Sequence, residues 1–302
     1  MIDYLDEDVA YLLGLIVARG EIIEGRTTTS ILVTFPFRNL IVEGISQSYK
    51  NPIELSLGLD RILNRIARLG ADVRKETQEK AVQLIIESKK KSLFMRVLTM
   101  FLAKEKTYLE FHIPKQILDA DKSIQKEFMR GYSDLAGYAR LSNQYIDGRH
   151  RIYLDILNSN WHLPVELCNL LQDKLNVPVQ TIDWGHPNIR DGNLEEYNAG
   201  RTRAWAREHQ LKIFAEDFAP VGFYMRHKSE ILKELAEYNK RNYSTTSKFC
   251  SPPKLISEKK PHHPAENDDT LPLNIRGKHF DSYRQVCEAL GCYRLKLQAK
   301  LG

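Results

Sequence analysis

Two nine-residue segments, LLGLIVARG at 12–20 and MRGYSDLAG at 129–137, follow one pattern. Gly14 aligns with Gly131 and Gly20 with Gly137, both at an offset of 117 residues. Each segment follows an apolar-periodic stretch with acidic residues near its start, as a helix N-terminus prefers. An internal repeat means that one structural unit is built twice, so the sequence predicts two related halves.

The residues after each segment also match. The runs 21–37 and 138–157 alternate apolar and polar residues and contain turn candidates, so each predicts a β-hairpin with one exposed face. A helical pattern follows at 56–73 and at 163–179, then a strand at 81–88 and at 209–216, then a helix at 92–102 and at 228–238. The predicted order is helix, hairpin, helix, hairpin, helix, twice.

The chain after about residue 243 differs in composition. Residues 243–272 are rich in Pro, Ser, Lys and Asp and indicate a linker or extended arm. Residues 278–301 carry apolar side chains at helical spacing and predict a small helical module or a docked helix. The predicted domains are therefore 5–118, 119–242 and 243–302. The tail contains five possible zinc ligands at spacings that match no zinc finger, so zinc is not expected: Cys250, His262, His263, Cys287 and Cys292.

Composition excludes some classes of protein and leaves others open. No run of about 18 apolar residues is present, and the acidic N-terminus lacks the basic region of a signal peptide. Four cysteines in 302 residues do not make a disulfide framework, which favours a reducing compartment. The net charge of +5 and pI near 8.8 are compatible with a nucleic-acid partner.

The two motifs and the matching order of elements resemble the LAGLIDADG homing-endonuclease family in its single-chain, two-repeat form, over roughly residues 5–240. The resemblance implies an α+β fold of two pseudo-symmetric αββαββα repeats, with the motif helices packed at the centre and antiparallel sheets forming a saddle for the DNA major groove. It also implies that the four motif glycines, Gly14, Gly20, Gly131 and Gly137, serve the helix interface. Glycine permits close backbone approach there because it has no Cβ.

The resemblance implies double-stranded DNA as partner, Mg²⁺ as cofactor if the protein cuts DNA, and no cofactor if it only binds. No membrane association is expected. A monomer is expected because two repeats already supply the pseudo-dimer. The expected location is the cytoplasm, in association with the nucleoid.

The eighth motif position departs from the family. There the family places an Asp or Glu in each motif, and the two carboxylates hold a divalent metal. This chain has Arg19 and Ala136, neither of which ligates a metal. No catalytic residue is therefore assigned. Glu21 and Asp134 are the candidate substitute metal ligands, or else carboxylates that cap or pack the helix ends. Lys104 and Lys106 fall where family members often place a basic residue near the scissile phosphate, although solvated surface lysines would look the same.

Arg19 has two interpretations. Its guanidinium binds a phosphate or a minor-groove edge at the centre of the molecule. Alternatively, it pairs with a nearby acid such as Glu21 or Asp134 and holds the helix interface.

Polar residues of the hairpins and of the long polar segment 181–209 are the candidate DNA contacts. Arginine suits guanine, and Asn or Gln suits adenine. In addition to Arg19, they are Arg26, Thr28, Ser30, Arg140, Ser142, Asn143, Gln144, Arg149, Arg151, Arg190, Arg201 and Arg203. Which of them face outward depends on strand register, and a slip of one residue reverses the answer.

Three functions remain open at this point. The first is a sequence-specific double-stranded DNA-binding protein that lacks the usual metal-binding carboxylates. The second is an active, metal-dependent, site-specific DNA endonuclease with relocated acids. The third, more distant, is an RNA-binding intron maturase. The residues do not give the target sequence, the biological pathway or the role of the C-terminal extension.

Overall fold

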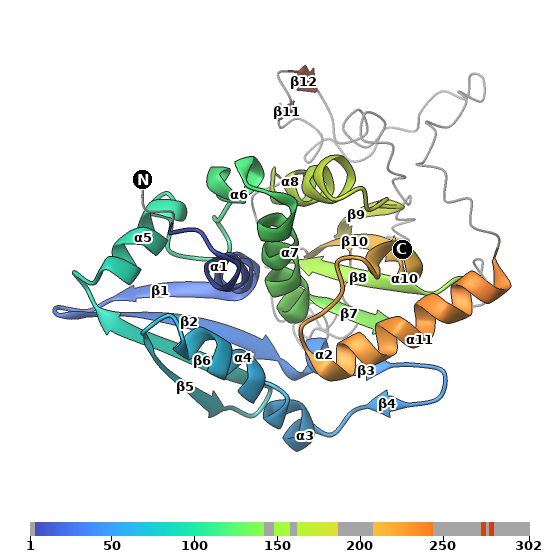
Figure 1. Ribbon diagram of the computed structural model, residues 1–302, viewed down its shortest axis with the longest axis horizontal. Helices are drawn as coiled ribbons and strands as arrows, with labels where there is room; N and C mark the ends of the chain where they lie inside the picture. Colours follow the sequence, from blue (N-terminus) through green and yellow to red (C-terminus); the bar gives the residue numbers. More distant parts are fainter. Residues whose placement is uncertain are drawn as a thin grey trace, which may run out of the picture.

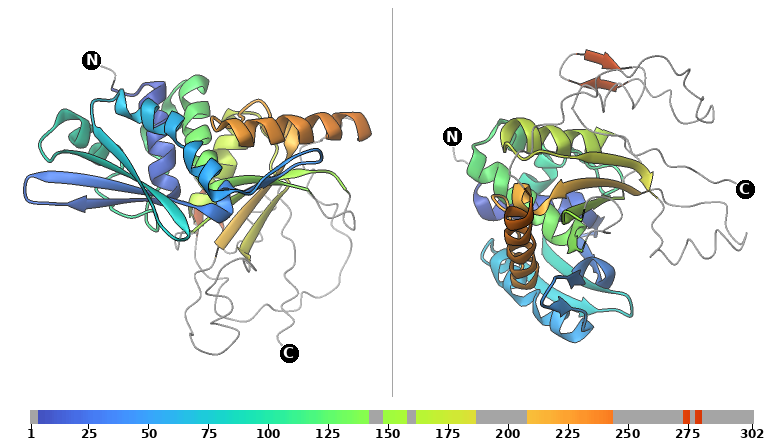
Figure 2. Two further views of the ribbon diagram at one scale, coloured as in Figure 1. Left: turned by 90° about the horizontal axis from the view of Figure 1, so that it is seen from below. Right: turned by 90° about the vertical axis from the view of Figure 1, so that its right-hand side faces the viewer.

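The computed structural model describes residues 4–141, 148–157, 162–186, 208–243, 273–275 and 278–280. Two four-stranded antiparallel sheets lie side by side, with two central helices between them and further helices along one side of both sheets (Figures 1 and 2). The predicted α+β fold class and the twofold repetition of elements are confirmed.

The first repeat begins with α1 and builds one sheet in the order β1-β2-β6-β5. Its elements are α1 (Glu7–Arg19), β1 (Gly20–Glu24), β2 (Thr28–Pro36), α2 (Phe37–Leu40), β3 (Val42–Glu43), β4 (Ser48–Tyr49), α3 (Pro52–Leu57), α4 (Asp60–Ala67), β5 (Asp72–Thr77), β6 (Ala81–Lys89), α5 (Leu93–Phe101) and α6 (Lys115–Asp119). The sequence predicted neither α2 nor the short β3–β4 hairpin, since their few residues carry no measurable periodicity.

The second repeat begins with α7 and builds the other sheet in the corresponding order β7-β8-β10-β9. Its elements are α7 (Lys122–Ala136), β7 (Gly137–Arg140), β8 (Arg151–Ile156), α8 (His162–Asn169), the π-helix η1 (Leu170–Lys174), β9 (Thr181–His186), β10 (Glu208–Phe214), α10 (Ala215–Phe218) and α11 (Arg226–Asn242).

The C-terminal part begins differently from the prediction. Residues 278–280 were predicted to open a helix, but they form β12 (Lys278–Phe280), which pairs with β11 (Leu273–Ile275). Leu273 and Phe280 are paired in this antiparallel hairpin. The backbone hydrogen bonds of residues 278–280 are therefore made to the neighbouring strand and not within a helix.

The hydrophobic core extends through both repeats. Inward-facing side chains of the sheets alternate with outward-facing ones, so Ile31, Val33 and Phe35 of β2 pack beneath the helices. Nearly all of α1 is buried, and its N-terminus is capped by the Asp6 carboxylate, which accepts a hydrogen bond from the Val9 amide at 2.8 Å. No helix within the described residues is long and apolar enough to cross a membrane.

Candidate functional site

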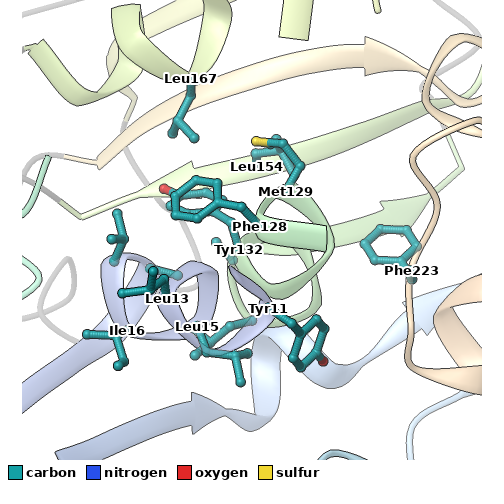
Figure 3. Close-up of a cluster of buried hydrophobic side chains, with 14 of the residues drawn as sticks. Tyr11, Leu13, Leu15, Ile16, Phe128, Met129, Tyr132, Leu154, Leu167 and Phe223 are labelled. Atoms are coloured by element: carbon teal, nitrogen blue, oxygen red, sulfur yellow. The ribbon is translucent and has the colours of Figure 1, made fainter. Parts of the chain in front are cut away.

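The two motif helices, α1 and α7, cross in direct backbone contact. A Cβ added at Gly14 would lie 2.1 Å from the Phe128 carbonyl oxygen, and one at Gly131 would lie 2.0 Å from the Tyr11 carbonyl oxygen. The offset of 117 relates one contact to the other, because Gly14 corresponds to Gly131 and Tyr11 corresponds to Phe128, so the interface has pseudo-twofold symmetry. Side chains from both helices, including Leu15 and Phe128, pack around the crossing (Figure 3).

The other two motif glycines do not lie in this interface, which corrects the expectation for Gly20 and Gly137. A Cβ at Gly20 would meet the backbone of Ile16 at 2.7 Å, and one at Gly137 would meet the Ser133 carbonyl oxygen at 2.6 Å. Both neighbours belong to the preceding turn of the same helix. The chain passes directly from helix to strand at each glycine, and only a residue without Cβ fits against the last helical turn.

Arg19 and Ala136 end the two motif helices, and both are buried, with 7% and 0% of their surfaces exposed. Arg19 stands in the last turn of α1, where a cation complements the negative end of the helix dipole. Its charge acts on the buried Tyr132 hydroxyl of α7: burial raises the pKa of Tyr132, Arg19 opposes this rise and Asp155 of β8 reinforces it. The Arg19 guanidinium therefore lies near residues of the second repeat.

This centre does not fit the divalent metal that the resemblance implies. The two family positions supply a buried cation and a methyl group instead of two carboxylates. Within the described residues, no group of three or more His, Cys, Asp or Glu side chains could hold a metal ion. A fixed guanidinium charge also repels a divalent cation.

Asp134 is fully buried two residues before Ala136 and uses its carboxylate for internal contacts. It accepts hydrogen bonds from the Tyr11 hydroxyl at 2.6 Å and from the amides of Tyr224 and Met225, each at 3.2 Å. Burial raises the pKa of Asp134, while the hydrogen bond from Tyr11 and the nearby Lys228 charge lower it. These contacts give Asp134 the packing role and leave it facing away from solvent.

Lys228 of α11 closes the same end of α7. Its ammonium is completely buried and donates hydrogen bonds to the carbonyl oxygens of Asp134, at 2.7 Å, and Gly137. These are carbonyls that the helix end leaves without intrahelical partners. Burial lowers the pKa of Lys228. Nothing in the sequence pattern indicated this buried lysine, since α11 reads as an ordinary amphipathic helix.

Glu21 is an exposed residue of β1, and Lys104 and Lys106 are exposed in the segment that follows α5. Glu21 pairs across the strand with Leu32 and bridges to Thr107, and the Lys106 carbonyl accepts from the Ile22 amide at 2.8 Å. The Lys106 ammonium lies 3.0 Å from Glu24, at the end of β1 far from Arg19. The two lysines therefore stand along the hairpin rather than beneath the motif helices.

The outer face of the first sheet carries the predicted polar residues. Thr28 and Ser30 point outward, because the buried Thr29 between them points to the core, and Arg26 is exposed in the β1–β2 turn. Ser30 donates to Glu87 at 3.3 Å, and Arg74 contacts the same carboxylate through both terminal nitrogens, at 2.7 and 3.3 Å. The arrangement presents a guanidinium and a hydroxyl in fixed positions.

The outer face of the second sheet is polar but buried, contrary to the prediction of an exposed face. Arg140 lies over the ring of Tyr153 at 4.6 Å, and Tyr138 and Tyr153 stack with ring centroids 5.5 Å apart. Lys212 forms an ion pair with Asp183. Ion pairs, hydrogen bonds and cation–π contacts connect the polar side chains on this face with one another.

Arg149 and Arg151 flank the start of β8 and pack against the ring of Phe214, at 3.7 and 4.9 Å. Arg149 also forms a buried ion pair with Glu216, its Nε lying 2.6 Å from the carboxylate. Its guanidinium is thus held internally and does not project toward a partner, which corrects its assignment as a base contact. Arg151 remains partly exposed.

Strand register reveals one pair of positions that the sequence analysis missed. Gln83 of β6 donates to the Thr34 hydroxyl at 3.3 Å, and Gln210 of β10 donates to the Asp155 carboxylate at 2.8 Å. These two contacts occupy equivalent places, because Val33 pairs with Gly20 and Leu154 pairs with Gly137. Each sheet therefore carries a glutamine on its outer face, level with the end of its motif helix.

Six candidate DNA contacts lie outside the described residues: Ser142, Asn143, Gln144, Arg190, Arg201 and Arg203. The possible zinc ligands of the tail, Cys250, His262, His263, Cys287 and Cys292, lie outside them as well.

Solved structures of homing endonucleases are similar to this chain. The structure of I-DmoI in complex with DNA and Ca covers 78% of this chain and 97% of its own, at 19% identity and a TM-score of 0.38. I-DmoI in complex with DNA and Mn covers 71% and 95%, at 18% identity and a TM-score of 0.37. The LAGLIDADG homing endonuclease I-GzeII in complex with its DNA target covers 78% and 89%, at 9% identity and a TM-score of 0.35. No protein-family model and no curated protein matches. The similar structures belong to the family that the two motifs resemble.

Proposed function

We propose that the chain is a sequence-specific double-stranded DNA-binding protein on a LAGLIDADG scaffold that does not use the family's central metal site. One observation carries the proposal: two motif helices cross at Gly14 and Gly131 and end on Arg19 and Ala136 instead of on two carboxylates. The scaffold is retained, and the chemistry of its centre has changed.

The outer face of the first sheet supports duplex binding. A twisted antiparallel ribbon fits a major groove about 12 Å wide, and its outward side chains then meet base edges. Ser30, Thr34, Arg74 and Gln83 present donors and acceptors on that face. Arg74 is fixed by its two contacts with Glu87, so little side-chain entropy is lost when it binds a base.

Burial supports an internal role for Arg19, the second of its two interpretations. A guanidinium with 7% exposure does not reach a phosphate without a rearrangement of its surroundings. In this proposal Arg19 is a fixed cation at the centre of the molecule, near Tyr132 of α7. Its charge holds the two repeats together. Asp134 is not assigned as the acid that Arg19 pairs with, because its carboxylate already accepts hydrogen bonds from Tyr11 and from the Tyr224 and Met225 amides.

Selection from a randomised duplex library tests the proposal. The purified full chain is incubated with the library in the presence of Mg²⁺ or, separately, Mn²⁺. Enrichment of one family of bound sequences without strand cleavage is the expected result. Double-strand cuts at a defined site would overturn the binding-only proposal in favour of a nuclease with relocated acids. Preferential binding of folded intron RNA over every duplex would favour the maturase.

A further inference from the structure

The end of the first sheet that lies farthest from the motif helices gathers exposed cations from three turns (left in Figure 1). The β1–β2 turn lies against the segment after β6, where the Lys90 amide donates to the Thr27 carbonyl at 2.9 Å and Lys89 pairs with Thr28. The segment after α5 lies along β1. We call the resulting cluster the basic tip; it consists of Arg26, Lys89, Lys90, Lys91, Lys104 and Lys106.

Two acids stand among these six cations, Glu24 and Glu105, which leaves an excess of four positive charges. Glu24 lies 2.8 Å from Lys90 and 3.0 Å from Lys106. Hydrogen bonds from these two lysines hold the pKa of Glu24 at about 2. Within the described residues, Arg26, Lys89, Lys91 and Lys104 have no carboxylate within ion-pair distance. Their charges are therefore available to an outside anion.

The rest of the sheet surface offers no comparable excess among the described residues. The outer face of the first sheet carries the acids Glu21, Asp72, Glu76 and Glu87, and Arg74 already pairs with two of them. On the second sheet, Arg149 and Lys212 are committed to internal carboxylates. Among the described residues of the two sheets, the basic tip therefore gathers the most exposed cations.

The geometry points to the basic tip as a binding site for the phosphate backbone of duplex DNA, on one flank of the target; this inference rests on the proposed function. β1 runs from Gly20, at the end of the motif helix, to Glu24, at the tip. At a rise of about 3.3 Å per residue, the tip stands roughly 13 Å from the centre, or about four base pairs along B-form DNA. The contact adds affinity without reading sequence, because phosphates carry no direct base information.

The test is a fourfold variant of the four cations that have no carboxylate partner, with Arg26→Gln, Lys89→Gln, Lys91→Gln and Lys104→Gln. Its binding to a fluorescein-labelled duplex of mixed sequence is measured as a function of salt. The matched control replaces four exposed lysines outside the tip and changes net charge equally: Lys115→Gln, Lys122→Gln, Lys233→Gln and Lys240→Gln. Circular dichroism verifies that both variants fold, and all substitutions are at exposed positions.

Counterion release sets the expected size of the effect. Each phosphate contact contributes about 0.9 to the slope of log K against log salt, so losing four lowers the slope by about 3.6. The affinity loss between about 50 and about 200 mM salt should then be on the order of 100-fold smaller for the tip variant than for the wild type. An unchanged slope in the tip variant, or an equal change in the control, would overturn the inference.

Glu24→Gln gives an independent test with the opposite sign. Removing this carboxylate releases Lys90 and Lys106 for phosphate, so binding should tighten by several-fold and the salt slope should steepen by up to about 1.8. If the two lysines serve only to fix the hairpin, Glu24→Gln will leave DNA binding unchanged and the inference fails. Failure of the library selection to enrich any site would instead overturn the proposed function. A salt slope that depends on the tip only with single-stranded RNA would assign the tip to another partner and also overturn the inference.

Discussion

Gly131→Ala tests the arrangement that brings the two repeats together. The added Cβ would lie 2.0 Å from the carbonyl oxygen and 2.9 Å from the carbonyl carbon of Tyr11, and 3.2 Å from the amide nitrogen of Leu15. All three atoms belong to the backbone of α1, so no side-chain rotation relieves the clash. Restoring an ordinary contact of about 3.4 Å requires the helices to separate by roughly 1.4 Å.

The cost follows from the packing that this separation removes. A radial gap of about 1 Å already forfeits a quarter to a half of each dispersion contact, and the crossing is lined by fully buried side chains. Overpacking typically costs about 1–3 kcal/mol, and a backbone clash lies at or above the upper end of that range. The better helix propensity of alanine returns about 1 kcal/mol. We expect a net loss of about 3 kcal/mol in the free energy of unfolding, or roughly 6–12 °C in Tm for a domain of this size.

Urea denaturation followed by circular dichroism measures this loss. Gly58→Ala is the matched control, because Gly58 has helical φ and ψ angles of −59° and −22° and its Cβ would approach nothing closer than 3.2 Å. It should change the free energy of unfolding by less than about 1 kcal/mol. Gly14→Ala should match Gly131→Ala, since its Cβ would meet the Phe128 carbonyl oxygen at 2.1 Å. A Gly131→Ala protein as stable as its Gly58→Ala counterpart would refute the close crossing.

Three further outcomes are expected. Arg65→Met should cost about 1.5–3 kcal/mol in urea denaturation, because it removes the cation 2.9 Å from the buried carboxylate of Glu127 and leaves that carboxylate paired with Arg130. Arg65→Lys should recover part of this loss, and full stability of Arg65→Met would contradict the prediction. Burial lowers the pKa of His227 to about 4, so its neutral form contributes stability that is lost as pH falls from about 6.5 to 4, by up to about 3 kcal/mol. The free energy of unfolding of the wild type, compared with that of His227→Gln, should fall by this amount over that pH range. Parallel curves of unfolding free energy against pH would refute the prediction. Arg19→Asp combined with Ala136→Asp should create Mg²⁺ affinity that calorimetry detects and the wild type lacks; no gain in a folded double variant would show that these positions do not converge.

Elements with a strong hydrophobic period were predicted from the sequence alone. The alternating runs of β2 and β6 appear where alternation predicted them, because the pleat makes the hydrophobic face readable from every second residue. The order helix, hairpin, helix could be predicted in both halves of the chain. The prediction for each half therefore supported the prediction for the other. Short elements such as α2 and the β3–β4 hairpin were not readable, since their conformation is set by the surfaces they pack on.

The candidate site could be predicted only in part, because the direction and contacts of its side chains also depend on packing. The outward direction of Thr28 and Ser30 became definite once β2 was paired with β6, and the Gln83 and Gln210 positions emerged only from that register. Arg149 looked like an exposed base contact, yet Glu216, which is far away in sequence, holds it inside. A lone arginine in a polar run gives no signal of a distant buried carboxylate.

The sequence by itself determined that this chain is one unit built twice, that its two motif helices end on Arg19 and Ala136, and that no pair of carboxylates occupies those two positions. These conclusions need only residue identities, periodicity and spacing. Tertiary structure alone decided which glycines touch the partner helix, that Arg19 and Lys228 are buried, and that the unpaired cations collect at one end of the first sheet. Each of those properties depends on contacts between residues distant in sequence, and such contacts exist only once the two repeats have packed together.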